Sequence, residues 1–421
     1  MSGGPYSPAT GAGRRRVVRV AVVGLGWAAK SIWLPRLHEH PGFTISAIVD
    51  PDPAALAGAV HGLGGTELLS SVDDLSPDMA DLAVVAVPNH LHATIACRLL
   101  GNGIPVFVEK PVCLDSHEAR QLAAAESASG SVLLAGSAAR YRADILALRD
   151  TVAGLGDIRH VEVSWVRARG IPDAGGWFTH RQLSGGGALV DLGWHLLDTV
   201  APLFGDGDGA VGFDQALGTV SDDFVRDSAA RAAWREQAPD EVQDAGGDVE
   251  DTARGFLVTD TGVSVGLRAS WASHEPYDVT EIRVDGSAGS ARLRCTFGFS
   301  PNRVPESELT VTRDGVVSDV PFTREPVGAE YMRQLDALPG LLADPASRGR
   351  AVRETLRTIT VIERIYASAR EARTAPATPS VSVSVPARLV ASSRTASPVR
   401  AVGAPAAIPT AGPVTPAPTL R

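Results

Sequence analysis

Lysine is rare in this 421-residue sequence, because only Lys30 and Lys110 of its 39 basic residues are lysines. Lys110 lies in the stretch FVEKPV, between Glu109 and Pro111. Arginine can serve wherever a fixed positive charge is enough, but only lysine can lose its proton once burial lowers its pKa. Lys110 is therefore a candidate for holding a reacting oxygen or for proton transfer, with a structural pairing to Glu109 as the alternative. Pro111 allows a cis bond that would fix the direction of the lysine.

The segment GGGALVDLGWHLLD, residues 185–198, could supply the complementary groups. Asp191 and His195 are four residues apart, so on a helix they share one face. A histidine can accept the proton of a hydroxyl group that is being oxidised, while a carboxylate orients or charges it. A single histidine on an amphipathic helix is more often structural, but together with Lys110 the pattern favours catalysis.

The segment GLGWAA, residues 24–29, follows an apolar run and opens a helical stretch. Gly24, Gly26 and Ala29 match the G-x-G-x-x-G/A pattern, in which glycines let the backbone approach a pyrophosphate and a helix N-terminus supplies N–H donors. Asp50 ends the next apolar run, where a carboxylate can accept hydrogen bonds from both ribose hydroxyls. The pattern predicts a dinucleotide site that favours NAD, with NADP as the alternative because nearby arginines can offset the carboxylate.

Other polar residues follow later apolar runs and should reach the same sheet edge. In VPNHLHA, residues 87–93, Asn89 could instead cap a helix. The complete set predicted to contact the cofactor is Gly24, Gly26, Trp27, Ala29, Asp50, Pro88, Asn89, His92, Glu109 and Lys110.

The stretch RARGIPDAGGWFTHRQLSGGG, residues 167–187, is predicted to form a wall of the substrate pocket. Its arginines could bind an anionic or glycosidic substrate, or they could be surface charges on an edge strand. The residues predicted to contact the substrate are Lys110, Arg169, Trp177, Asp191 and His195.

The elements that must position these residues follow two patterns. Between residues 17 and 140, nearly continuous β-branched runs alternate with helical stretches, which predicts a doubly wound α/β domain with a parallel sheet. Between residues 141 and 371, strands joined by short Gly- and Asp-containing turns predict an α+β domain with an open, mostly antiparallel sheet. Within it, residues 205–250 lack a clear period and are predicted to be a mobile insertion. Residues 1–16 and 372–421 have compositions typical of disorder.

Composition narrows the class of protein. The net charge is −9, and no basic block extends beyond residues 14–16, which argues against nucleic acid as a partner. Three scattered cysteines predict free thiols in a reducing cytoplasm and no metal site. No apolar stretch is long enough for a membrane span, and no signal-peptide core follows the N-terminal arginines. These features predict a cytoplasmic protein that acts on small molecules.

Taken together, the motifs resemble the GFO/IDH/MocA family over residues 17–371. The resemblance rests on GLGWAA, the Glu-Lys-Pro tripeptide at 109–111, GGGALVDLGWHLLD, Arg140-Tyr141 and the late segment ERIYASARE at 363–371. It implies a Rossmann domain followed by a sheet whose open face often makes dimer or tetramer contacts. Ala29 departs from the commoner third glycine, and the insertion at 205–250 has no matching counterpart.

The resemblance also implies reversible hydride transfer between NAD(P) and a secondary alcohol of a sugar, amino sugar or cyclitol such as inositol. Lys110 corresponds to the family's catalytic lysine, and Asp191 and His195 correspond to its substrate and proton-transfer pair. Three alternatives stay open: a keto-sugar nucleotide reductase of natural-product biosynthesis, an enzyme that retains NAD through a redox cycle, and a non-catalytic cofactor sensor. The intact catalytic trio disfavours the sensor.

Overall fold

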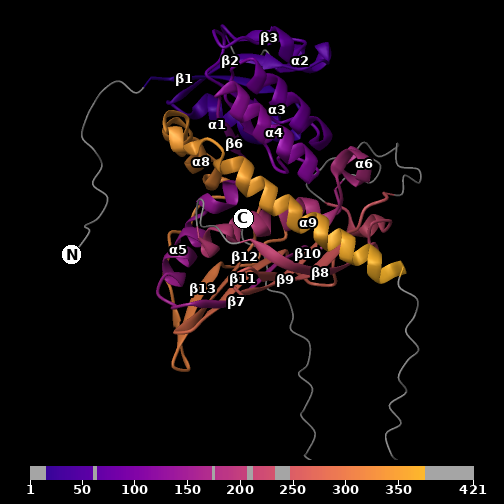
Figure 1. Cartoon of the computed structure of the whole chain (residues 1–421), viewed down its shortest axis with the longest axis vertical. Helices are drawn as coiled ribbons and strands as arrows, with labels where there is room; N and C mark the ends of the chain where they lie inside the picture. The colour runs from indigo at the N-terminus through magenta and orange to yellow at the C-terminus, as the bar shows by residue number, and fades with distance from the viewer. Residues whose placement is uncertain (1–15, 60–63, 173–175, 206–211, 233–246, 375–421) are drawn as a thin grey trace, which may run out of the picture. The chain divides into compact units, whose positions relative to one another are not determined.

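The computed structural model describes residues 16–59, 64–172, 176–205, 212–232 and 247–374. Its elements form two sheets, with helices packed around both (Figure 1). The predicted disorder of residues 1–15 and 375–421 lies outside the described residues. Residues 372–374, predicted to be disordered, instead complete the last helix.

The N-terminal sheet has six parallel strands in the order β3-β2-β1-β4-β5-β6. Its four central strands are largely buried because helices cover both faces, as the continuous apolar runs predicted. The order reverses between β1 and β4, the point at which doubly wound sheets bind ligands. The strands are β1 Val18–Val23, β2 Phe43–Val49, β3 Glu67–Leu69, β4 Leu82–Val85, β5 Val106–Val108 and β6 Leu133–Ala135.

Short connections and helices join these strands. The short strand β3 and the helix α2 were not predicted from the sequence. The elements are η1 Ala29–Trp33, α1 Leu34–Glu39, α2 Pro53–Ala59, η2 Val72–Asp74, η3 Asn89–Leu91, α3 His92–Gly101, α4 Ser116–Ser129, η4 Ala138–Tyr141 and α5 Ala143–Val152.

The C-terminal sheet has eight strands in the order β14-β13-β12-β11-β7-β10-β9-β8. All neighbours are antiparallel except β7 and β10, which are parallel. The predicted open, mostly antiparallel sheet is therefore present. Its strands are β7 Ile158–Val166, β8 Phe213–Ser221, β9 Thr252–Thr259, β10 Ser264–Ser270, β11 Val279–Gly286, β12 Gly289–Cys295, β13 Glu308–Arg313 and β14 Val316–Asp319.

The remaining helices lie around this sheet and against the N-terminal domain. The longest of them, α9, contacts both α4 and β8, so it joins the two domains (Figure 1). The elements are η5 Trp177–Thr179, α6 Arg181–Ser184, η6 Leu189–Gly193, α7 Trp194–Val200, η7 Ala201–Phe204, η9 Ser228–Ala230, α8 Ala329–Ala343, η10 Pro345–Ser347 and α9 Arg350–Thr374.

The predicted insertion at 205–250 is wrong where it overlaps β8, which forms an edge of the sheet beside β9. On the inner side of β8, the helix α9 lies close against Gly218. A Cβ atom on Gly218 would lie 2.6 Å from a side-chain carbon of Ile365 in α9. The outward Leu217 is 64% exposed, so the strand presents a large apolar side chain on its outer side. Residues 206–211 and 233–246 lie outside the described part of the chain.

Candidate active site

The glycine loop after β1 has a shape that only glycine permits at its first position. Gly24 has a φ of +92°, and a Cβ there would lie 2.8 Å from Val87 Cγ1 and 2.9 Å from the Ala86 carbonyl oxygen. The backbone N–H of Leu25 donates to Asp50 Oδ2 at 2.7 Å, so the carboxylate at the end of β2 holds the loop. This bare backbone beside a carboxylate fits a dinucleotide.

A cavity of about 400 Å³ opens beside this loop, between the carboxyl edge of the parallel sheet and the C-terminal domain. Ten predicted site residues line it: Gly26, Trp27, Pro88, Asn89, His92, Glu109, Lys110, Trp177, Asp191 and His195. Gly24, Ala29 and Asp50 do not. Ala29 is completely buried, so the contact predicted between it and the cofactor is wrong; its small side chain instead allows close helix–strand packing.

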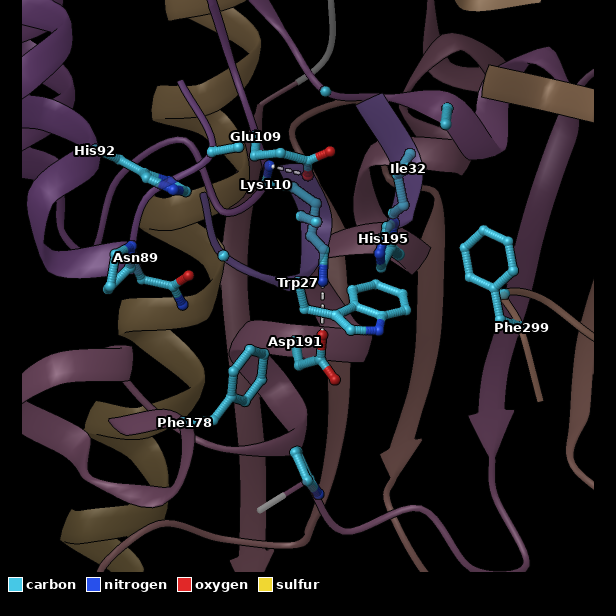
Figure 2. Close-up of a pocket in the computed structure, with 18 of the residues that line it drawn as sticks. Trp27, Ile32, Asn89, His92, Glu109, Lys110, Phe178, Asp191, His195 and Phe299 are labelled. Atoms are coloured by element: carbon cyan, nitrogen blue, oxygen red, sulfur yellow. Dashed lines mark hydrogen bonds and ion pairs between the residues drawn. The ribbon is translucent and has the colours of Figure 1, made fainter. Parts of the chain in front are cut away.

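Lys110 and Asp191 meet across the cavity from opposite domains (Figure 2). The ammonium nitrogen lies 2.7 Å from Asp191 Oδ1, and the Trp271 indole donates to Oδ2 at 2.9 Å. Burial opposes ionisation of Asp191, but the charges of Lys110 and Arg167 outweigh it and hold the pKa of this carboxyl well below its ordinary value. Asp191 is therefore an anion that keeps the ammonium at one place.

His195 stands one helical turn beyond Asp191, beside the same cavity. Its ring centre lies 5.6 Å from that of Trp165. Burial, with the positive charges of Lys110 and Arg167, lowers the pKa of this imidazole from 6.5 to about 3. His195 is consequently neutral near pH 7 and able to accept a proton or a hydrogen bond.

The alternative role of Lys110 was a structural ion pair with Glu109. In the structure, the carboxylate of Glu109 binds other groups instead. Its Oε1 accepts from the Trp33 indole at 2.8 Å, and its Oε2 accepts from the backbone N–H of Lys110 at 2.9 Å. Burial raises the pKa of this carboxyl. The Lys110–Pro111 bond is cis. The function of Glu109 in this geometry is to fix the loop that carries the lysine.

Two further predicted residues hold loops at the rim of the cavity. The ring nitrogens of His92 lie 2.6 Å from the Pro111 carbonyl oxygen and 2.9 Å from that of Val87. Burial lowers the pKa of His92. The buried Asn89 donates its amide to the carbonyl of Ser184, which tethers the two domains.

The substrate prediction for Arg169 is wrong, because this residue is exposed and does not line the cavity. Arg167, two residues earlier, lines the cavity instead, with Nη1 at 4.0 Å from Asp191 Oδ2. The strand β7 ends at Val166, and its alternation of inward and outward side chains ends there too. The sequence therefore could not show whether Arg167 or Arg169 points into the cavity. Phe178 and Phe299 also line the cavity and were not predicted.

The fold and the site define a nicotinamide-dependent oxidoreductase. Residues 18–137 match the model "Oxidoreductase family, NAD-binding Rossmann fold", and residues 145–292 match the GFO/IDH/MocA C-terminal domain. The chain belongs to the GFO/IDH/MocA family, as the sequence motifs predicted. The predictions of an enzyme and of an NAD(P) cofactor are confirmed with it.

Three known proteins illustrate the similarity. A protein of Amycolatopsis mediterranei (strain S699), assigned as a UDP-kanosamine synthase oxidoreductase subunit, is 56% identical over 362 residues, which are 86% of this chain and 99% of the relative. The aldose-aldose oxidoreductase of Caulobacter crescentus has a TM-score of 0.68 at 23% identity, covering 85% of this chain and 99% of that one. A 3-ketoreductase of Actinomadura kijaniata has a TM-score of 0.64 at 19% identity, covering 83% and 97%. The two structures show the shared fold.

Proposed function

We propose that this protein transfers hydride reversibly between NAD and a secondary hydroxyl group of a nucleotide-linked hexose, with the corresponding keto sugar as product. The observation that carries the proposal is the Lys110–Asp191 pair, which lies beside His195 at the carboxyl edge of the dinucleotide domain. NADP is the alternative cofactor.

The chemistry needs an acceptor for hydride, an acceptor for the hydroxyl proton and a group that holds the oxygen. NAD supplies the first when it is bound. His195 supplies the second, because its imidazole is neutral at pH 7. The Lys110 ammonium donates to the substrate oxygen and stabilises negative charge there as the C–H bond breaks. Asp191 keeps the ammonium in place, and the reverse order of the same steps reduces a ketone.

The substrate class rests on the Amycolatopsis relative. Its assigned name connects it with UDP-kanosamine, a nucleotide-linked amino sugar, and calls it a subunit. An amine can replace a hydroxyl group through a ketone, so an oxidoreductase subunit would provide the ketone to a partner that installs nitrogen. Arg167 and the aromatic rings of Trp27, Trp177 and Phe299 line a cavity suited to a sugar with an anionic substituent. Free sugars, amino sugars and cyclitols are the competing substrates.

Nicotinamide absorbance tests the proposal directly. Purified protein is mixed with NAD or NADP and with UDP-glucose, TDP-glucose, free glucose or myo-inositol, while hydroxylamine traps any ketone. NADH formation with the nucleotide sugars supports the proposal; NADH formation with inositol or free glucose alone would replace the substrate class. A protein that retains NAD would show no net absorbance change, but it would exchange deuterium between a labelled carbinol carbon and its bound cofactor.

We also propose that the protein is a cytoplasmic homodimer or homotetramer that associates through the open face of the C-terminal sheet. Leu217 of β8 and Phe256 of β9 pair across the strands on this face and are 64% and 50% exposed. An exposed apolar pair within a sheet is a common feature of an interface. The three cysteines are free thiols, which suits a reducing compartment. In the part of the chain that the structure describes, every helix is too short or too polar for a membrane crossing.

A further inference from the structure

We propose that Glu250 is a positioning residue, which sets the location of Asp191 and His195 by clamping the start of the helix that carries them. We refer to residues 189–200 as the catalytic helix. Glu250 is far from this helix in sequence and lies at the end of the stretch that was predicted to be a mobile insertion. The inference rests on the proposed catalytic roles of Lys110, Asp191 and His195.

The carboxylate of Glu250 caps the first residues of the catalytic helix. Its Oε1 accepts from the backbone N–H groups of Gly187 at 3.0 Å and of Leu189 at 3.1 Å. Its own carbonyl oxygen accepts from the N–H of Ala188 at 3.1 Å. Three successive backbone donors thus end on one distant residue. The Leu189 donor is only two residues before Asp191, so a shift at the clamp would move the catalytic carboxylate.

Side chains from two other elements hold the Glu250 carboxylate in place. Tyr366 of α9 donates its hydroxyl to Glu250 Oε1 at 2.7 Å, and Arg181 of α6 lies 3.2 Å from Oε2. The Arg181 guanidinium carbon lies 4.8 Å from the Tyr366 ring centre, so these two partners also contact each other. Glu250 is 3% exposed and Tyr366 is 7% exposed. A buried carboxylate with this set of donors has few other orientations.

The glycines before the helix permit this contact. A Cβ on Gly187 would lie 1.8 Å from the Glu250 carbonyl oxygen, and one on Gly186 would lie 2.0 Å from the Tyr366 hydroxyl. Real side chains cannot approach so closely. The glycine run therefore allows Glu250 and Tyr366 to pack against the start of the helix. The late ERIYASARE segment has no role in the proposed reaction itself, and its Tyr366 contributes by holding Glu250.

The test separates positioning from simple stabilisation with a matched control. Glu126 is also a 3% exposed glutamate; it accepts from the backbone N–H groups of Leu133 and Gly349, each at 2.9 Å, and it does not line the active-site cavity. E250A and E126A should both lower the melting temperature. Only E250A should lower kcat, by roughly 10- to 100-fold, because a displacement of about 1 Å can cost that much.

Conservative variants locate the effect within the clamp. E250Q keeps an oxygen for the backbone donors and should recover most of the kcat lost in E250A. Y366F keeps the ring beside Arg181 and removes one hydrogen bond, so kcat should fall only a few-fold. KM for NAD should stay within about twofold in all of these variants, because the glycine loop lies in the other domain.

A second readout needs no substrate. The chain has only two lysines, so in a K30R background Lys110 gives the one lysine signal after reductive methylation with ¹³C-formaldehyde. E250A should shift this NMR signal because Asp191 moves relative to the ammonium, whereas E126A should leave it in place. An unmoved signal in E250A together with unchanged kcat would overturn the inference. Wild-type protein that turns over no sugar, while E250A still shifts the signal, would instead refute the proposed function and leave the clamp intact.

Discussion

Lys110 Nζ lies 2.7 Å from Asp191 Oδ1, and this ion pair connects the two domains across the cavity. Its two members come from the end of β5 and from the catalytic helix, 81 residues apart. The carboxylate is also fixed by Trp271. The ammonium is thereby oriented before any substrate arrives, which reduces the reorganisation that the reaction requires.

Replacement of Lys110 should impair turnover while it preserves the fold. K110A removes the group that holds the substrate oxygen, so kcat should fall by ~10² or more. Affinity for NAD, measured by tryptophan fluorescence, should change little. K110R keeps the positive charge but cannot release a proton, so it distinguishes charge from proton transfer. Near-normal turnover in K110A would remove the lysine from the mechanism.

Trp271 should influence catalysis through Asp191, although it is fully buried and does not line the cavity. W271F removes the indole donor and leaves Oδ2 free to rotate away, so kcat should fall by about tenfold. A double-mutant cycle with D191N tests this route. If Trp271 acts through Asp191, kcat of the double variant should be little lower than kcat of D191N alone. Additive losses would show that the indole acts by another route.

Asp50 should favour NAD over NADP. Its Oδ2 accepts from Leu25 N–H and its Oδ1 from Asp52 N–H, so the carboxylate is fixed beside the glycine loop, where a 2′-phosphate would meet its charge. D50N keeps an acceptor for the loop and removes the charge. The ratio of kcat/KM for NAD to that for NADP should fall by about tenfold. An unchanged ratio would show that other groups select the cofactor.

The sequence predicted ten of the residues that line the candidate cavity, because its motifs mark the ends of elements. Gly26 and Lys110 follow strongly patterned strands, and parallel strands bring such ends together. His195 was predicted from its four-residue spacing to Asp191 on one helix face. Trp271 and Glu250 escaped prediction because their partners lie 80 and 61–63 residues away in sequence, and no local pattern encodes a contact of that kind. The strand β8 was missed for a related reason, since α9 determines which of its faces is buried.

His195 should make stability depend on pH in acid. The pKa of its imidazole is about 3 in the folded protein against an ordinary 6.5, so between these values the unfolded chain binds a proton that the folded protein excludes. Stability from this residue is therefore present above about pH 6.5 and is lost as the pH falls toward 3, by at most about 1.4 kcal/mol per pH unit. H195Q cannot titrate, so its stability should decline less.

Urea unfolding of wild type and H195Q at about pH 7, 6 and 5 measures the difference between their free energies of unfolding. The contributions of the other titrating groups are nearly the same in both proteins and largely cancel. The free energy of unfolding of H195Q relative to wild type should rise steadily as the pH falls. A constant difference would mean that His195 takes up its proton equally well in the folded protein. In that case the imidazole would keep a pKa near 6.5 in the folded protein, and the exclusion of a proton from the buried ring would be refuted.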